Sequence, residues 1–193
     1  LQSVAKAGQL ADSSGPDHWE TASLSALSRH IVEKHHAFCR EALEGITALL
    51  AKTVQAHGAN HPELGRIQSL FSGMSSELNL HMMKEEKTLF PMIAQMEDAR
   101  SQGRPPAQFP FGRIQNPISM MIFEHNDTGN GLKEIRELSK GYEPPADACN
   151  TYRSLYEGLR EFEADMHQHI YLENYVLFPR TVALERGGEI QPL

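Results

Sequence analysis

Cysteine and tryptophan are scarce in this sequence, with two cysteines and one tryptophan among 193 residues. Cys39 and Cys149 lie far apart and form no Cys-x-x-Cys arrangement. Neither a disulfide scaffold nor a zinc ribbon is therefore expected. A chain of this length can bury a sizeable core without cross-links. We expect a single domain that folds unaided, and a cytoplasmic location.

Basic residues are fewer than acidic ones, and long apolar runs are absent. The formal net charge is −7, whereas binding to nucleic acid or to an anionic membrane surface requires a basic face. No apolar run approaches the roughly 18 residues of a membrane span, and residues 1–15 lack the layout of a signal peptide. We therefore expect neither nucleic acid nor a membrane as a partner. The chain begins with Leu1, which suggests a fragment or a processed product.

Histidine, by contrast, is abundant, and part of it belongs to a repeat. The segment HMMKEEKTLFP, from His81 to Pro91, returns 88 residues later as HIYLENYVLFP, from His169 to Pro179. Both copies fit the template H-x-x-x-E-x-x-x-L-F-P. Residues four apart share one face of a helix, so each copy can present an imidazole and a carboxylate together. We interpret the repeat as a duplicated pair of metal ligands.

Apolar residues recur at spacings of three and four in four segments, which predicts four long helices. These helices are expected over about 21–56, 63–98 and 116–140, and from about 146 onward with a kink at Pro179. Asn116 and Pro117 resemble a helix start, with an N-cap followed by proline. The Pro- and Gly-rich stretch 99–115 is expected to be a crossover or a lid.

Two short connections and one long one predict an all-α fold, an antiparallel four-helix bundle. His36 and His81 are 45 residues apart and His125 and His169 are 44 apart, which indicates two copies of one helical hairpin. His125 and His169 match less well in height, and the GYEPP turn is expected to absorb the difference. We divide the chain into a leader or linker at 1–20, the bundle at 21–187 and a flexible tail at 188–193.

Six residues with metal-binding side chains lie on the predicted core stripes: His36, His81, Glu85, His125, His169 and Glu173. A carboxylate buried in an apolar core requires a cation, and no Arg or Lys lies on the stripes beside these glutamates. Imidazole mixed with carboxylate suits iron, manganese or zinc, of which we favour iron. Two ions, bridged by both glutamates and an oxo or hydroxo group, would each keep about one open coordination position.

Several of these assignments have alternatives. His35 lies on a second stripe that is almost as good as that of His36, although helical phase favours His36. Glu77 and Glu124, beside the predicted ligands, are candidates for an acidic route for protons or iron, or else are solvated carboxylates. His167 is off the ligand face, and the Leu-Phe-Pro triplets are expected to contribute packing.

The ligand pattern resembles the hemerythrin-like (HHE) cation-binding domain. The segments HMMKEEKTLFPMI, Glu124-His125 and HIYLENYVLFPR resemble in particular the di-iron proteins that repair iron-sulfur clusters, also described as regulators of cell morphogenesis and nitric oxide signalling. This resemblance covers roughly residues 20–186. It implies two iron ions bridged by Glu85 and Glu173, and a stress-response role in repairing iron-sulfur clusters after nitrosative or oxidative damage.

The sequence also departs from both groups. Oxygen-carrying hemerythrins have a fifth histidine where this chain has Gly129, and an Asp where Glu173 stands. Full-length repair proteins place a cysteine-bearing domain ahead of the bundle, and this chain has no adjacent cysteine pair. The expected function is iron donation to damaged or apo iron-sulfur proteins, reduction of nitric oxide, or both. The alternative is a module that binds or senses oxygen or nitric oxide. Enzymatic activity and a homodimer stay open.

Overall fold

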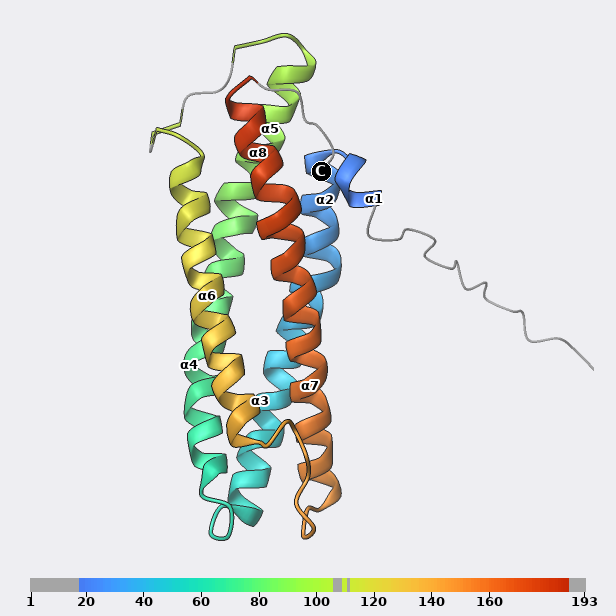
Figure 1. Ribbon diagram of the computed structural model, residues 1–193, viewed down its shortest axis with the longest axis vertical. Helices are drawn as coiled ribbons and strands as arrows, with labels where there is room; N and C mark the ends of the chain where they lie inside the picture. The colour runs from blue at the N-terminus through green and yellow to red at the C-terminus, as the bar shows by residue number, and fades with distance from the viewer. Residues whose placement is uncertain (1–17, 106–108, 111, 188–193) are drawn as a thin grey trace, which may run out of the picture.

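Four long helical runs form the body of the protein (Figure 1). The computed structural model describes residues 18–105, 109–110 and 112–187. The first run comprises α2 (Leu24–His30), the π-helical segment η1 (Ile31–His36) and α3 (Ala37–His57), and the second comprises α4 (Glu63–Lys84), η2 (Glu85–Leu89) and α5 (Phe90–Ser101). The third is α6 (Gln115–Leu138), and the fourth comprises α7 (Asn150–Tyr171), η3 (Leu172–Leu177) and α8 (Phe178–Glu185). A short helix, α1 (His18–Thr21), precedes them.

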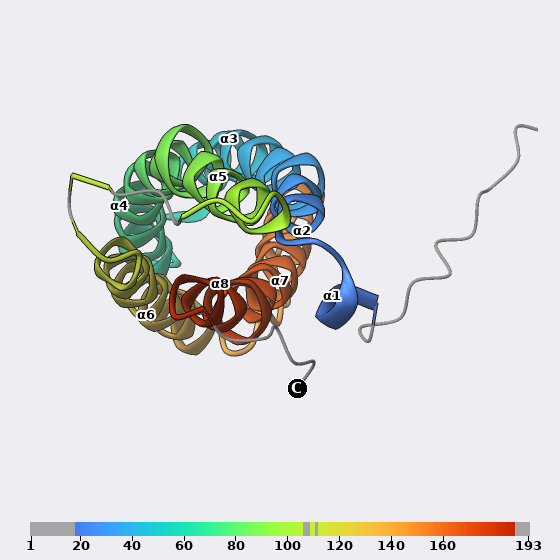
Figure 2. The same cartoon turned by 90° about the horizontal axis from the view of Figure 1, so that it is seen from above.

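Successive runs point in opposite directions, because the α3–α4 and α6–α7 connections lie at one end of the molecule while α5 and α8 lie at the other (Figure 1). The α3 helix packs against α4 and α7, and α4 packs against α6. Seen from above, the four runs surround a common axis (Figure 2). The predicted all-α antiparallel four-helix bundle is therefore confirmed. Among the described residues, no helix combines the length and apolarity needed to cross a membrane.

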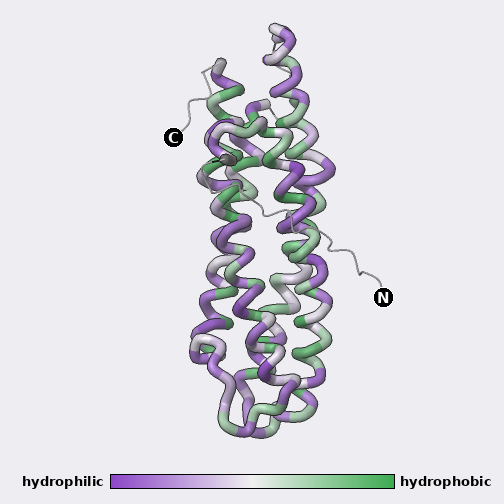
Figure 3. The backbone as a smooth tube through the Cα atoms, turned by 90° about the vertical axis from the view of Figure 1, so that its right-hand side faces the viewer, coloured by the Kyte–Doolittle hydropathy of each residue, from purple (hydrophilic) through white to green (hydrophobic). Residues whose placement is uncertain are grey.

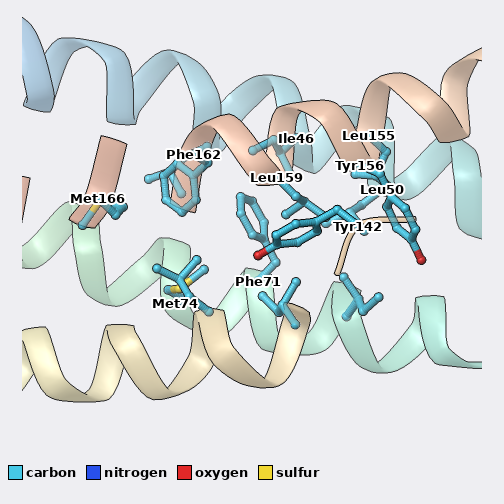
Figure 4. Close-up of a cluster of buried hydrophobic side chains, with 14 of the residues drawn as sticks. Ile46, Leu50, Phe71, Met74, Tyr142, Leu155, Tyr156, Leu159, Phe162 and Met166 are labelled. Atoms are coloured by element: carbon cyan, nitrogen blue, oxygen red, sulfur yellow. The ribbon is translucent and has the colours of Figure 1, made fainter. Parts of the chain in front are cut away.

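Hydrophobic side chains fill the bundle in two separate clusters. Hydrophilic and hydrophobic stretches alternate along each run (Figure 3), as expected for helices with one buried face. The first cluster joins α3, α4, α6 and α7 around Phe71, Leu159 and Phe162 (Figure 4). The second joins α2, α5, α6 and α8, with η1, η2 and η3, around Leu27, Ile93 and Phe178. The six predicted ligands occupy the level between these clusters.

The α6–α7 connection compensates for the different distances of His125 and His169 from the ends of their helices. His125 lies 13 residues before the end of α6, whereas His169 lies 19 residues after the start of α7. Three consecutive residues in this connection, Lys140, Gly141 and Tyr142, have positive φ angles, which sharply redirect the chain. Tyr142 then returns into the first cluster, where its hydroxyl donates a hydrogen bond of 2.9 Å to Glu163. The predicted GYEPP turn thus brings the two histidines to one level.

Three details of the predicted elements differ from the structure. The second run extends to Ser101, and α6 begins at Gln115, so Asn116 lies inside α6 and is not its N-cap. The α6 start is stabilised instead by Glu185, whose carboxylate accepts the Ile114 N–H at 2.7 Å. The predicted leader is helical at its end, in α1; residues 1–17 and the tail 188–193 lie outside the described part of the chain.

Candidate metal centre

The six predicted ligands come together in the middle of the bundle, and all are 3% exposed or less. Their ligand atoms form two groups, in each of which one atom per residue lies within 4.8 Å of the others. One group contains His36, Glu85, His169 and Glu173, and the other contains His81, Glu85, His125 and Glu173. Glu85 and Glu173 belong to both groups. Such a buried histidine and glutamate cluster is able to hold a metal cation.

Distances between neighbouring ligand atoms are compatible with the binding of a metal ion between them. The Nε2 atoms of His36 and His81 each lie 3.3 Å from a different oxygen of Glu85. Around Glu173 the corresponding distances are 3.0 Å to His125 and 3.1 Å to His169. Two ligands at right angles around an ion with bonds of about 2.1 Å lie about 3 Å apart. Among the described residues, neither oxygen of Glu85 has a hydrogen-bond partner, which also fits metal ligation.

A π-helical segment contains or adjoins the ligands on three of the four runs. The segment η1 ends at His36, η2 begins at Glu85, and η3 contains Glu173. A π-turn places one extra residue in a helical turn and is common at functional sites. The segments η2 and η3 each end just before a Phe-Pro pair that opens the next helix. Because proline lacks an N–H and its ring clashes with the preceding turn, a widened turn accommodates it without ending the run.

The phenylalanines of the repeated Leu-Phe-Pro triplets pack against ligand histidines. The rings of Phe90 and His36 lie 5.9 Å apart and are inclined by 21°. The rings of Phe178 and His125 lie 6.1 Å apart and are inclined by only 6°. In both cases the phenylalanine comes from one copy of the repeat and the histidine from a different helical run. The triplets thus contribute packing, as expected from the sequence. Their phenylalanines also restrict the orientation of the rings of His36 and His125.

Carboxylates hold two of the histidines from behind. Nδ1 of His36 lies 2.8 Å from Glu86, which also pairs with Arg40. Nδ1 of His81 lies 2.7 Å from Glu124. When Nε2 binds a metal, Nδ1 carries the proton, and its N–H donates a hydrogen bond to such a partner, which orients the ring and makes it more basic. Glu124, proposed from the sequence as part of an acidic route, thus contacts a predicted ligand directly.

The two supporting carboxylates stay ionised. Burial raises the pKa of Glu86, but hydrogen bonds from Arg40 and His36 outweigh it, and the net pKa is lowered. Burial likewise raises the pKa of Glu124, and contacts with Lys84 and His81 bring the net pKa below its usual value. An ionised carboxylate is the stronger acceptor for an imidazole N–H.

Burial and neighbouring charges have opposite effects on the pKa values of Glu173 and His81. Burial is the largest effect on Glu173 and raises its pKa, but His169 and His125 together lower the pKa well below its ordinary value. Burial lowers the pKa of His81, whereas Glu85, Glu173 and Glu124 jointly raise it to about 9. In the absence of a metal, a proton on His81 therefore balances part of the charge of the two buried glutamates. A site that favours a cation beside these carboxylates is suited to a metal cation.

A pocket of about 220 Å³ reaches the site from the groove between α4 and α6. Its lining includes His81, Lys84, Glu124 and the exposed Glu77. Glu77 and Glu124, the two candidates for an acidic route, thus line the same pocket as the predicted ligand His81.

Other residues that the sequence singled out lie elsewhere. His35 is fully buried directly behind the ligand group, and its ring stacks on that of His169. His167 is exposed on α7. Gly129 is half-buried, and a Cβ atom added there would meet nothing within 4 Å.

Sequence reasoning missed two residues that contact the ligands, Glu86 and Asn174, and a third, Asp165, that contacts His35 behind them. Glu86 and Asn174 immediately follow the ligands Glu85 and Glu173, and Asp165 lies one turn before the ligand His169. A polar residue beside each ligand was the available signal, but such residues are also common on solvated helix faces.

Comparison with known proteins agrees with this geometry. A family model described as the hemerythrin HHE cation binding domain matches residues 27–181. Iron-sulfur cluster repair protein YtfE of Pectobacterium atrosepticum is 35% identical over 85% of this chain and 68% of its own length. YtfE of Citrobacter koseri is 35% identical over 94% of this chain and 76% of its own length. YtfE of Edwardsiella ictaluri is 38% identical over 94% and 78% respectively.

Proposed function

Because this chain belongs to the hemerythrin HHE cation-binding domain family and is similar throughout to YtfE iron-sulfur cluster repair proteins, we propose that it repairs iron-sulfur clusters damaged by nitrosative and oxidative stress. The observation that carries the proposal is the pair of buried ligand groups that share Glu85 and Glu173. We assign this function to residues 21–187. Its partners would be damaged or apo iron-sulfur proteins, with nitric oxide as a reactant.

The proposal assigns two iron ions to the site. His36 and His169 would hold one ion, and His81 and His125 the other. Glu85 and Glu173 would bridge both, because each glutamate belongs to both ligand groups. A mixed imidazole and carboxylate set suits iron. Six protein ligands leave coordination positions for a further bridging group and for a small molecule. Bound iron would supply a redox-active centre that can bind nitric oxide.

The protein's own residues suit it to release iron as cargo. The pocket between α4 and α6 is lined by His81 and by three carboxylates, Glu77, Glu124 and Asp127. Glu124 supports the His81 ring, since its carboxylate lies 2.7 Å from Nδ1 of His81. A cation that leaves through this pocket would be received by Glu77, which lines the same pocket and is exposed. Oxygen ligands of this kind bind iron more weakly than the mixed set inside the bundle.

The test is iron transfer to an apo iron-sulfur protein under anaerobic conditions. The iron-loaded protein should restore the cluster spectrum of the acceptor when sulfide is supplied, and the Glu173→Ala variant should not. Free ferrous iron with a strong chelator present serves as the control for transfer through solution. The reduced protein should also react with nitric oxide, and in air it should oxidise without a lasting oxygen adduct.

The same samples test the alternative function. An oxygen adduct that persists and dissociates on degassing, together with negligible transfer of iron, would identify an oxygen-binding or sensing module. Gly129 favours the repair function, because the oxygen carriers that the sequence resembles have a fifth histidine there.

A further inference from the structure

The four histidines at the site differ in what holds their outward-facing nitrogen, Nδ1. Three have a partner among the described residues: His36 with Glu86, His81 with Glu124, and His125 with Asn174. Within the described part of the chain, Nδ1 of His169 has no hydrogen-bond partner. Hydrogen-bonded partners behind ligand histidines typically strengthen metal binding by 10- to about 100-fold. The two halves of the site are therefore unequal.

His35 contacts the ring of His169 from outside the ligand group. Its ring is stacked on that of His169, with a centroid distance of 5.7 Å and an angle of 13° between the planes. His35 is held on its other side, because its Nδ1 lies 2.9 Å from Asp165. Asp165 is on the same helix as His169, one turn before it. The His169 ring is thus fixed by ring contact with an anchored histidine.

Packing alone does not account for a histidine at position 35. The side chain is completely buried, and its Nε2 has no hydrogen-bond partner among the described residues. A buried polar atom without a partner is destabilising, whereas a phenylalanine would fill similar space without that penalty. The imidazole at position 35 is therefore better explained by its effect on His169 than by the stability of the core.

We propose that His35, anchored by Asp165, positions His169 by ring stacking, and that the iron ion held by His36 and His169 is the one that the protein releases first. The second part rests on the proposed function, in which two irons are bound and iron is donated. The ion held by His81 and His125 has both imidazoles fixed by hydrogen bonds. Its partner ion has one imidazole fixed in this way and one fixed only by stacking.

The experiment follows the loss of iron from the di-iron protein to a colorimetric ferrous chelator under anaerobic conditions. The wild-type protein should lose iron in two phases of equal amplitude, with rates that differ by roughly tenfold or more. His35→Ala should accelerate the fast phase by roughly tenfold and leave the slow phase unchanged. His35→Phe keeps a ring at this position but cannot pair with Asp165, so it should restore only part of the wild-type rate.

Three further variants assign the phases and guard against misfolding. Glu124→Gln weakens the support of His81 and should accelerate the slow phase only. Asp165→Asn removes the charge that anchors His35 but leaves every ring in place, and it should also accelerate the fast phase. This variant tests the proposal even when His35→Ala does not fold. His167→Gln, an exposed histidine on the same helix, should change neither phase.

Other outcomes would overturn the proposal. A single phase that releases both irons would show that the two halves are equivalent. A fast phase that responds to Glu124→Gln but not to His35→Ala or Asp165→Asn would place the labile ion on the His81 side. Failure of the proposed function would give a different result from failure of this inference. If the proposed function is wrong, the protein would bind fewer than two irons, or it would show both phases without transferring iron to an apo iron-sulfur protein.

Discussion

The stability of the metal-free protein should fall as the pH rises from about 6.5 to about 9. The test removes the metal with a chelator and then varies the pH. Without a metal, part of the charge of Glu85 and Glu173 is balanced by protonated His81, whose pKa is raised to about 9 from 6.5. A pKa that is higher in the folded state stabilises the fold below 6.5, and this contribution is lost as the pH passes through 9.

The size of this effect follows from the same pKa. A difference between 6.5 and about 9 corresponds to about 3 kcal/mol, at about 1.4 kcal/mol for each pH unit. This is a substantial part of the 5–15 kcal/mol that is typical of a folded domain. On the acid side, the pKa of Glu173 is lowered well below its ordinary value. Its contribution is present above about 4.5 and is lost as the pH falls further. The metal-free protein should be most stable between these limits.

Urea denaturation of the chelator-treated protein at pH 6, 7.5 and 9, followed by circular dichroism, measures this dependence. The free energy of unfolding should decrease by about 2–3 kcal/mol from pH 6 to pH 9. His81→Gln should remove most of the slope, whereas His167→Gln should retain it. Iron should reverse the trend, because protons and metal compete for the imidazoles. Unfolding free energy that is constant or rises with pH in the metal-free protein would refute this account of the buried charges.

Further predictions concern three other positions. Gly129→His should slow the loss of iron to a chelator and remove about 1 kcal/mol of mid-helix glycine destabilisation, since a side chain there meets no clash; equal rates of loss would show that position 129 does not face the site. Phe178→Ala should cost about 3–5 kcal/mol in denaturant titrations, whereas Phe123→Ala, at a position 61% exposed, should change stability by less than about 0.5 kcal/mol. Glu77→Gln should slow iron transfer to an apo acceptor without lowering iron content, and an unchanged transfer rate would remove Glu77 from the route.

The sequence predicted the bundle well because its information is periodic. Four stripes with spacings of three and four define four helices, and the connections define their directions. The equal spacing of His36 to His81 and of His125 to His169 predicted that these side chains meet, and the structure brings them together. The choice of His36 over His35 followed helical phase, and His36 is the residue that the structure places in a ligand group.

Features that depend on contacts between helices were not predictable in this way. The π-helical segments shift the phase of a run by one residue, and nothing local in η1 (Ile31–His36) distinguishes it from an α-helix. Glu86 and Asn174 occupy off-stripe positions that ordinary solvated residues also occupy. Their roles depend on the neighbouring helix, which supplies His36 to one and His125 to the other. The cap of α6 was misassigned to Asn116 for the same reason, since Glu185 accepts the Ile114 N–H from α8.

Iron content per chain tests the central claim most directly. Protein produced with iron available and purified anaerobically should contain about two irons per chain, and both Glu85→Ala and Glu173→Ala should lose most of both ions, because each glutamate would serve two metals. Circular dichroism on the same samples shows whether the variants remain helical. At most one metal per chain in the wild-type protein, or full iron occupancy in both folded variants, would contradict a di-iron centre bridged by these two residues.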